Sequence, residues 1–194
     1  MGIRKEIKEK HKEIPALDRY ELLSRMRQAG SHRNKALIAL LYITGARVEE
    51  VVKYNVKGEL KGRPILKKQI EIQEEQMVVR GVRCLKTKND LKRRSIPVVF
   101  KQVEQPFINV FLGYIKDIDD DSPLFNITRQ RAYQILSRVG LFCHWLRHSR
   151  ITHLVVDYGF SESQLVKFTG WSDGRVAVQY THLNVTDLID QMKK

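Results

Sequence analysis

The most constraining feature of this 194-residue sequence is an almost wholly apolar segment at residues 35–44, KALIALLYIT, which is followed by Gly45. A segment of this length that is apolar on every face indicates a buried helix, and a glycine just beyond it favours a helix end. The chain length suits one ordinary domain, or at most two small ones, with a genuine core. A hydrophobic content of 42% is consistent with a folded chain.

Periodicity and turn residues predict further helices on both sides of a short β-prone stretch. The first expected helix begins at Pro15, and another follows a capping box at Ser161 and Gln164. The other expected helices cover residues 48–54, 102–116, 128–138, 145–158, 175–182 and 185–192. The expected strands cover 70–72, 77–85 and 95–99, with turn residues Asn89 and Asp90 between the last two. We therefore predict a mainly α (α+β) fold with a small antiparallel three-stranded sheet. Residues 1–14 are expected to be a polar linker or N-terminal remnant, and 15–194 one domain with a C-terminal tail helix.

The positive charge is concentrated in the first half of the chain. The net charge is +13 at neutral pH, and residues 1–100 hold 24 Lys and Arg against 12 Asp and Glu, whereas residues 101–194 hold 11 against 10. Such a basic excess favours a polyanionic partner over a merely solvated surface. The residues we expect to contact DNA are clustered around the β-prone stretch: Arg80, Arg83, Lys88, Lys92, Arg93 and Arg94.

Several protein classes are excluded by simple features. No apolar segment approaches the roughly 18 residues that a membrane span needs. The N-terminal sequence lacks the apolar stretch of a secretory signal, and two cysteines are too few for a disulfide framework. We therefore expect a soluble, cytoplasmic protein.

Two polar motifs in the first half carry candidate chemistry. In TGARVEE, Arg47 stands where one helix ends and the next begins, and Glu50 follows three residues later. A guanidinium held there can grip two oxygens of one phosphate, although an ordinary helix-end salt bridge is the simpler interpretation of this motif alone. In LKTKN, Lys86 and Lys88 lie near the predicted hairpin turn, where lysines are usually just solvated.

Two more motifs follow in the second half. In HWLRH, His144 and Arg147 are three residues apart and share a helix face, which suits an anion. His144 and His148 have the spacing of a helical metal pair, but no glutamate or cysteine set completes a metal site. Trp171 follows a glycine, and Tyr180 lies nine residues later. For each of these aromatic residues, packing in the core is the default interpretation.

Taken in order, the four motifs resemble those of the catalytic domain of the tyrosine recombinases, also called the phage integrase family. The resemblance covers about residues 15–192. TGARVEE resembles the box whose arginine binds the scissile phosphate, and KTKND resembles the β-hairpin with the catalytic lysine. HWLRHSRITHLV is similar to the H-x-x-R box, and GWSDGRVAVQYTHL to the box that ends in the nucleophilic tyrosine.

The resemblance implies DNA strand cleavage and rejoining without a metal or cofactor. Tyr180 would attack the scissile phosphate, forming a 3′-phosphotyrosine and a free 5′-hydroxyl. Arg47, supported by Glu50, and Arg147 would stabilise the transition state. Lys86 would protonate the leaving 5′-oxygen, with Lys88 as the alternative.

The two remaining site residues differ in what they can do. His144 would bind the phosphate and could accept the tyrosine proton. Trp171 would occupy the place of a His or Trp in the family pattern. Indole has one donor and does not titrate, so Trp171 could only donate a hydrogen bond and pack the helix of Tyr180.

This sequence departs from the family pattern in two further respects. Only about 15 polar residues precede the first expected helix, so we expect this chain to lack the usual N-terminal DNA-clamping domain. Arg150 replaces an apolar or small residue, adding a cation that would contact phosphate or pair with an acid.

The predicted function is therefore site-specific recombination, as in integration or excision of a mobile element. The Lys/Glu-rich composition is typical of an archaeal virus or plasmid integrase. The alternatives are an Xer-type resolvase of chromosome dimers, a type IB topoisomerase-like enzyme, and a DNA-binding module without catalysis. The expected partners are a double-stranded DNA attachment site and further copies of the chain. We expect a tetramer on DNA and a monomer when free. Residues 184–194 would either pass to a neighbouring copy or fold back on their own domain.

Overall fold

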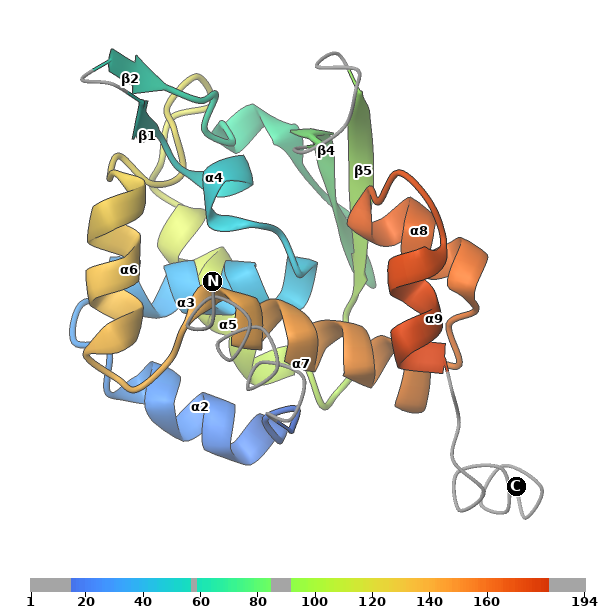
Figure 1. Cartoon of the computed structure of the whole chain (residues 1–194). Coiled ribbons are helices and arrows are strands. Elements are labelled where there is room, and N and C mark those ends of the chain that lie inside the picture. The colour runs from blue at the N-terminus through green and yellow to red at the C-terminus, as the bar shows by residue number, and fades with distance from the viewer. Residues whose placement is uncertain (1–14, 57–58, 85–91, 182–194) are drawn as a thin grey trace, which may run out of the picture.

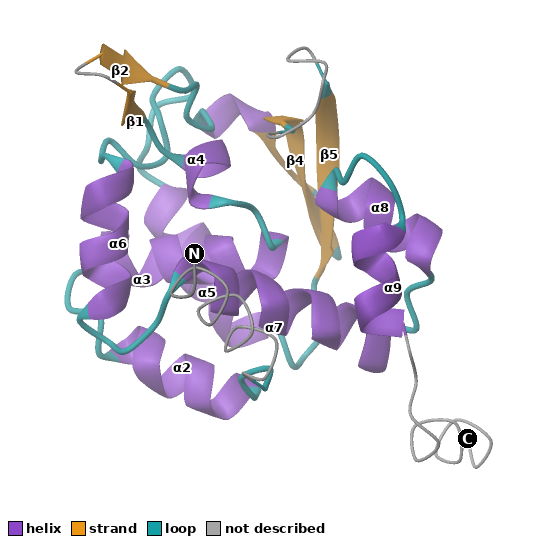
Figure 2. Cartoon of the chain, in the orientation of Figure 1, coloured by secondary structure: helices purple, strands orange, loops and turns teal. Residues whose placement is uncertain are grey.

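A mainly helical domain with a three-stranded sheet and a two-stranded sheet is the architecture of the computed structural model, which describes residues 15–56, 59–84 and 92–181 (Figures 1 and 2). Within these ranges the helices are α2 (Arg19–Arg27), α3 (His32–Thr44), α4 (Val48–Val51), the 3-10 helix η1 (Lys67–Gln69), α5 (Gln105–Ile115), α6 (Arg129–Ser137), α7 (Cys143–Val156), α8 (Glu162–Thr169) and α9 (Arg175–Thr181). The strands there are β1 (Tyr54–Val56), β2 (Glu59–Lys61), β3 (Ile70–Ile72), β4 (Gln76–Arg83) and β5 (Arg93–Val99). The predicted fold class is confirmed. Among the described helices, none has the length and apolar character that crossing a membrane would require.

Helix α3 is the centre of the core. Every residue from Ala36 to Thr44 is at most 1% exposed, as the apolar run predicts. Helices α5 and α7 pack against α3, strand β5 contacts it as well, and α2 lies alongside (Figure 1). Gly45 ends the helix in a left-handed conformation with a φ of 56°. The chain can therefore turn sharply from the core toward the surface at this point.

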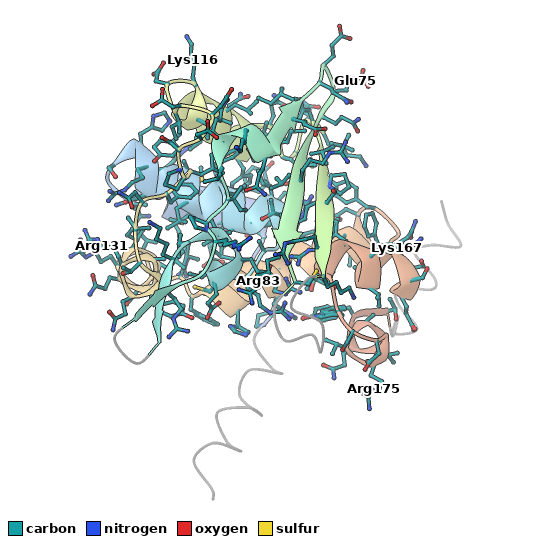
Figure 3. All side chains as sticks on the ribbon, turned by 90° about the horizontal axis from the view of Figure 1, so that it is seen from above. Glu75, Arg83, Lys116, Arg131, Lys167 and Arg175 are labelled. Atoms are coloured by element: carbon teal, nitrogen blue, oxygen red, sulfur yellow. The ribbon has the colours of Figure 1, made fainter. Side chains whose placement is uncertain are left out.

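The sheet has the order β3-β4-β5, with both neighbouring pairs antiparallel. Alternate residues of β5 are buried, which is the pattern of a strand with one face on the core. Helix α8 packs against β5. Glu75 and Arg83 mark opposite ends of β4 in Figure 3, and the Arg83 end leads into the predicted lysine hairpin, which lies outside the described residues.

Most predicted helices are confirmed, several with their capping residues. The Thr128 hydroxyl accepts a hydrogen bond from the Arg131 amide at the start of α6. Ser161 and Gln164 form the expected reciprocal capping box of α8. The predicted helix at residues 185–192 and the polar segment 1–14 lie outside the described residues.

Several predicted helix boundaries are wrong, and the structure shows the cause for two of them. The first helix begins at Arg19 instead of Pro15, because the Asp18 carboxylate accepts a hydrogen bond from the Tyr20 amide at 2.6 Å and so caps the helix there. Helix α4 ends at Val51 instead of Tyr54. The backbone of Lys53 pairs with the segment before α6, accepting from the Arg129 amide at 2.8 Å, which draws the chain into an extended path. The β1–β2 hairpin that follows was not predicted.

A buried ionic cluster around Glu104 joins α2, α5 and α7. The Glu104 carboxylate is fully buried, and its Oε1 accepts hydrogen bonds from Arg19 at 3.1 Å, Arg150 at 2.7 Å and Tyr158 at 3.1 Å. Arg150 is 2% exposed. The structure therefore assigns Arg150 to this cluster, and its predicted place among the DNA-contacting residues is corrected: the arginine pairs with an acid.

The end of α8 approaches the sheet so closely that only glycine fits. Gly170 caps the helix in the left-handed conformation, with a φ of 71°. A Cβ atom at this position would lie 2.7 Å from the Cys84 sulfur and 2.9 Å from Arg94 Nη1. Both neighbours are buried, so this contact fixes the distance between α8 and the sheet.

Replacing the acid at the centre of the ionic cluster should destabilise the protein strongly. In Glu104→Gln, the buried Arg150 guanidinium loses its charge partner, and we expect a loss of about 3 kcal/mol in the free energy of unfolding. The control is Asp121→Asn, which removes the acid of an exposed ion pair with Lys68 and should leave the stability unchanged. Urea unfolding curves of both variants measure the difference. Equal stability of the two variants would contradict the role of the cluster.

An alanine at Gly170 should cost more stability than one at Gly30, which has the same backbone conformation with open space around it. Gly30 has a φ of 75° and nothing within 4 Å of an added Cβ, so Gly30→Ala should cost only the left-handed strain of about 1 kcal/mol. Gly170→Ala adds the clash with Cys84 and Arg94, for which we expect a further loss of about 1–3 kcal/mol. Thermal unfolding compares the two variants, and similar losses would show that the sheet yields to the extra methyl group.

Candidate active site

Segments that are far apart in the sequence meet at one cavity of about 320 Å³. The residues that line it come from the start of α4, from α7, from the loop after α8 and from α9: Arg47, His144, Arg147, His148, Gly170, Trp171, Ser172, Val176 and Tyr180. Five residues that the motifs predict as catalytic are therefore brought together. The sixth, Lys86, lies outside the described residues, as does its alternative Lys88.

Arg147 is held by backbone carbonyls at the ends of two helices. Its Nη1 donates to the Gly45 carbonyl after α3, and its Nη2 donates to the Thr169 carbonyl of α8 at 3.2 Å. The carbonyls at helix C-termini carry partial negative charge and favour a cation. Burial, and then the neighbouring Arg47 cation, lower the pKa of Arg147 to about 9, so the side chain stays protonated at neutral pH.

Glu50 fixes Arg47 from within the protein. Its carboxylate accepts from the Arg47 backbone amide at 2.8 Å and from Arg47 Nη1 at 3.3 Å. The predicted supporting contact is therefore present. Burial alone would raise the pKa of the Glu50 carboxyl, but Arg94 and then Arg147 lower it below its usual range.

Arg94 is the stronger partner of Glu50, which differs from the DNA contact that we expected. The Arg94 guanidinium makes two hydrogen bonds to the Glu50 carboxylate, at 3.1 and 2.8 Å, and the residue is 8% exposed. A bidentate pair of this kind has the geometry that suits arginine best. Arg94 therefore supports the site from strand β5 and faces away from solvent.

The Tyr180 ring lies between two other rings. Trp171 stacks on it with a centroid distance of 5.9 Å and an interplanar angle of 26°. His148 contacts it with centroids 5.4 Å apart, and the His148 Nδ1 lies 3.3 Å from the Tyr180 hydroxyl oxygen. Burial raises the pKa of the Tyr180 hydroxyl, although Arg147 opposes this, and the phenol is therefore protonated at neutral pH.

The two histidines of α7 that line the cavity differ in exposure. His144 is exposed, whereas His148 is half-buried. Burial lowers the pKa of His148, which keeps the imidazole neutral at neutral pH. Among the residues that the structure describes, no three His, Cys, Asp or Glu side chains gather closely enough to hold a metal ion.

The remaining basic residues of the predicted DNA-contacting set surround the end of β4. Arg80 is exposed and pairs with Glu71 across the sheet at 2.8 Å. The Lys92 ammonium donates to the Trp171 carbonyl at 3.2 Å, which links the end of the lysine hairpin to the loop of the site. Arg83 and Arg93 line a second cavity, of about 380 Å³, on the other side of Glu50.

The arrangement combines an anion-binding site with a potential nucleophile. Arg47 and Arg147 line the same cavity as the Tyr180 hydroxyl, so a phosphate bound between the guanidinium groups would lie within that cavity beside the phenol. The indole of Trp171 closes the site beside Arg147, whose guanidinium carbon lies 5.7 Å from the ring centroid.

Two features of the site were missed by sequence reasoning. The motif HWLRH contains His148 one helical turn after His144, a spacing that we interpreted only in terms of metal binding. The pairing of Arg94 with Glu50 left no local signal, because the two residues are 44 positions apart.

Comparisons with known proteins agree with the motifs. No family model matches the chain. The chain is 28% identical over 193 residues to tyrosine recombinase XerA of Saccharolobus solfataricus, covering 96% of this chain and 58% of that protein. It spans about half the length of the curated relatives it matches, which also include recombinases named XerC and XerD.

Solved structures show the same fold. The XerH site-specific recombinase, bound to its difH substrate in a pre-cleavage complex, matches with a TM-score of 0.63 and 17% identity, over 91% of this chain and 53% of that chain. The crystal structure of a XerA recombinase matches with a TM-score of 0.60 and 20% identity, over 93% of this chain and 64% of that chain. The chain is therefore similar in sequence to tyrosine recombinases and shares the fold of their solved structures.

Proposed function

We propose that this chain cleaves and rejoins DNA strands at a specific site through a 3′-phosphotyrosine intermediate. The observation that carries the proposal is the meeting of Arg47, Arg147 and the Tyr180 hydroxyl at one cavity. The relatives that the chain matches are named as tyrosine recombinases, and the proposal extends that activity to this chain.

The two arginines would stabilise the transition state. In the transition state, the non-bridging oxygens of the pentavalent phosphorus carry extra negative charge. Cationic donors that are fixed next to these oxygens stabilise that charge and so lower the activation barrier of cleavage. Arg47 is held by Glu50, and Arg147 by two carbonyls, so neither has to reorganise during the reaction. Arg147 is a buried cation whose two hydrogen bonds go to neutral carbonyls, so an anion in the cavity would be bound strongly.

The remaining roles follow the motifs. The Tyr180 oxygen would attack phosphorus, and the 5′-oxygen would leave with a proton from Lys86. His144 would hydrogen-bond a phosphate oxygen from its exposed position at the cavity. Trp171 would donate its indole N–H to the phosphate and support the Tyr180 ring on which it stacks.

We further propose double-stranded DNA as the partner. The basic excess of residues 1–100 supports this, and one matched structure is the XerH recombinase bound to its difH substrate. The basic residues that we propose for contact with DNA are Arg80, Arg83, Lys88, Lys92 and Arg93. We propose that copies of the chain assemble as a tetramer on paired sites, and that the protein acts in the cytoplasm, at the nucleoid when bound to DNA.

Integration or excision of a mobile element is the form of recombination that we favour. The Xer names of the relatives are compatible with resolution of chromosome dimers as well. Plasmids that carry two recovered sites in direct or inverted orientation separate these outcomes by their products. Relaxation of supercoils at no particular sequence would instead indicate a topoisomerase-like activity.

Loss of the Tyr180 hydroxyl should abolish covalent attachment to DNA. A pool of nicked duplexes with a randomised sequence is a probe that requires no knowledge of the natural site. We expect the wild-type chain to form a denaturation-resistant protein–DNA species, and Tyr180→Phe to form none, because the attacking oxygen is missing. The matched control is Tyr20→Phe, since Tyr20 is 87% exposed and should keep the wild-type yield.

Two results of this adduct assay would contradict the proposal. Adducts at equal yield with Tyr180→Phe would place the nucleophile elsewhere. A wild-type chain that binds the pool and forms no adduct would indicate a DNA-binding module without catalysis. Sequencing of the recovered duplexes would identify the site.

The role of Trp171 predicts an ordered series of rates. Trp171→His should stay active, because imidazole also donates a hydrogen bond, whereas Trp171→Ala should cleave on the order of 100-fold more slowly because both the donor and the stacked ring are lost. Single-turnover cleavage of a recovered nicked duplex measures all three proteins. Equal rates would remove Trp171 from the mechanism.

A further inference from the structure

The Tyr180 hydroxyl has a polar neighbour, His148, that none of the motif-based roles uses. The His148 Nδ1 lies 3.3 Å from the Tyr180 oxygen, and the two rings touch with a centroid distance of 5.4 Å. His148 comes from α7 and Tyr180 from α9, and the two helices pack against each other. Trp171 also stacks on the Tyr180 ring, so the phenol contacts both residues.

We propose that His148 is the catalytic base that takes the proton of the Tyr180 hydroxyl during cleavage and returns it during rejoining. The inference rests on the proposed function, because it assumes that Tyr180 is the nucleophile. It differs from the role that the motifs give to His144, which is the first histidine of the H-x-x-R box.

The groups around the phenol favour an imidazole as the acceptor. Arg147 and His144 reach the cavity from α7, and Arg47 reaches it from the start of α4. A guanidinium has no lone pair to accept a proton, and the indole of Trp171 has none either. His148 is kept neutral by burial, so its ring can accept a proton when the Nδ1 is the unprotonated nitrogen.

The proton balance of the step is complete when Lys86 has the role given to it under the proposed function. As the Tyr180 oxygen bonds to phosphorus, its proton passes to the His148 Nδ1. The bond from phosphorus to the 5′-oxygen breaks, and that oxygen takes a proton from Lys86. In rejoining, the 5′-hydroxyl attacks the phosphotyrosine, its proton returns to Lys86, and His148 protonates the leaving phenol oxygen.

The surrounding charges couple proton transfer to attack on phosphorus. Burial lowers the pKa of His148 and so disfavours its protonation before a phosphate is bound. The additional negative charge of the pentavalent phosphorus would favour the imidazolium. His148 would therefore become a strong enough base only when the phosphate is bound and the reaction is under way.

A cleavage assay with a matched histidine pair tests the proposal. His148→Asn keeps a small polar side chain near the hydroxyl but cannot take a proton, and we expect cleavage of the nicked duplex to slow by about 100-fold or more. The control is His153→Asn. His153 lies on the same helix and its Nδ1 bonds another tyrosine hydroxyl, that of Tyr42 at 2.9 Å, but it lies outside the cavity and should keep the wild-type rate.

A second substrate separates proton transfer from a purely structural role. In the Tyr180→Phe background, a duplex with a 3′-p-nitrophenyl phosphate at the nick can be rejoined by attack of the 5′-hydroxyl, which expels p-nitrophenolate. This leaving group needs no proton, so His148→Asn should rejoin this substrate at the rate of the Tyr180→Phe parent. Arg147→Lys should remain slow, because the charge on phosphorus still develops.

The outcomes distinguish the inference from the proposed function. A His148→Asn protein that is slow on both substrates, or unimpaired on both, would overturn the role of His148 as the base. That role is overturned as well if His144→Asn, and not His148→Asn, is slow in cleavage and normal on the p-nitrophenyl ester. If the wild-type chain forms no covalent adduct at all, the proposed function itself fails.

Discussion

The site depends on the hydrogen bonds that the Arg147 guanidinium donates to backbone carbonyls at the ends of two helices. The carbonyls of Gly45 and Thr169 belong to segments more than 120 residues apart, and both accept from this one side chain. Burying a cation is costly, and the carbonyl dipoles offset only part of that cost. The burial and the nearby Arg47 therefore leave the pKa of Arg147 lowered to about 9. The folded chain holds a buried positive charge at the cavity, and under the proposed function a substrate phosphate would bind beside it.

Glu50 extends this constraint to the sheet. It binds Arg47 on the side of the cavity and Arg94 on the side of strand β5, so one carboxylate connects the Arg47 side chain to the β-structure. Arg94 in turn lies against Gly170, where no side chain fits. The loop that carries Trp171 starts at this glycine. The first arginine, the sheet and the tryptophan loop are thus positioned by one buried ion pair, which explains how distant motifs keep a common geometry.

Local signals in the sequence predicted much of this structure. The apolar run of α3, the cap at Thr128 and the capping box at Ser161 each act within a few residues, and each was found. The sequence could not indicate the partners of Arg94 and Arg150, because the carboxylates that pair with them are 44 and 46 residues away. The set of basic residues that we predicted to contact DNA therefore included both exposed cations and buried cations that form structural ion pairs. The end of α4 was misplaced for a similar reason, since the pairing of Lys53 with the segment before α6 is a long-range contact.

Helix α7 shows how position, more than residue type, decides the chemistry available to a side chain. His148 and His153 are both histidines whose Nδ1 bonds a tyrosine hydroxyl, and burial lowers the pKa of each. The Tyr42 ring that faces His153 is sealed in the core, where burial raises the pKa of its hydroxyl and no substrate can reach it. The Tyr180 ring that faces His148 lines the cavity beside two guanidinium groups. A pair of an imidazole and a phenol is therefore structural at His153 and Tyr42. At His148 and Tyr180 the same kind of pair is placed for proton transfer.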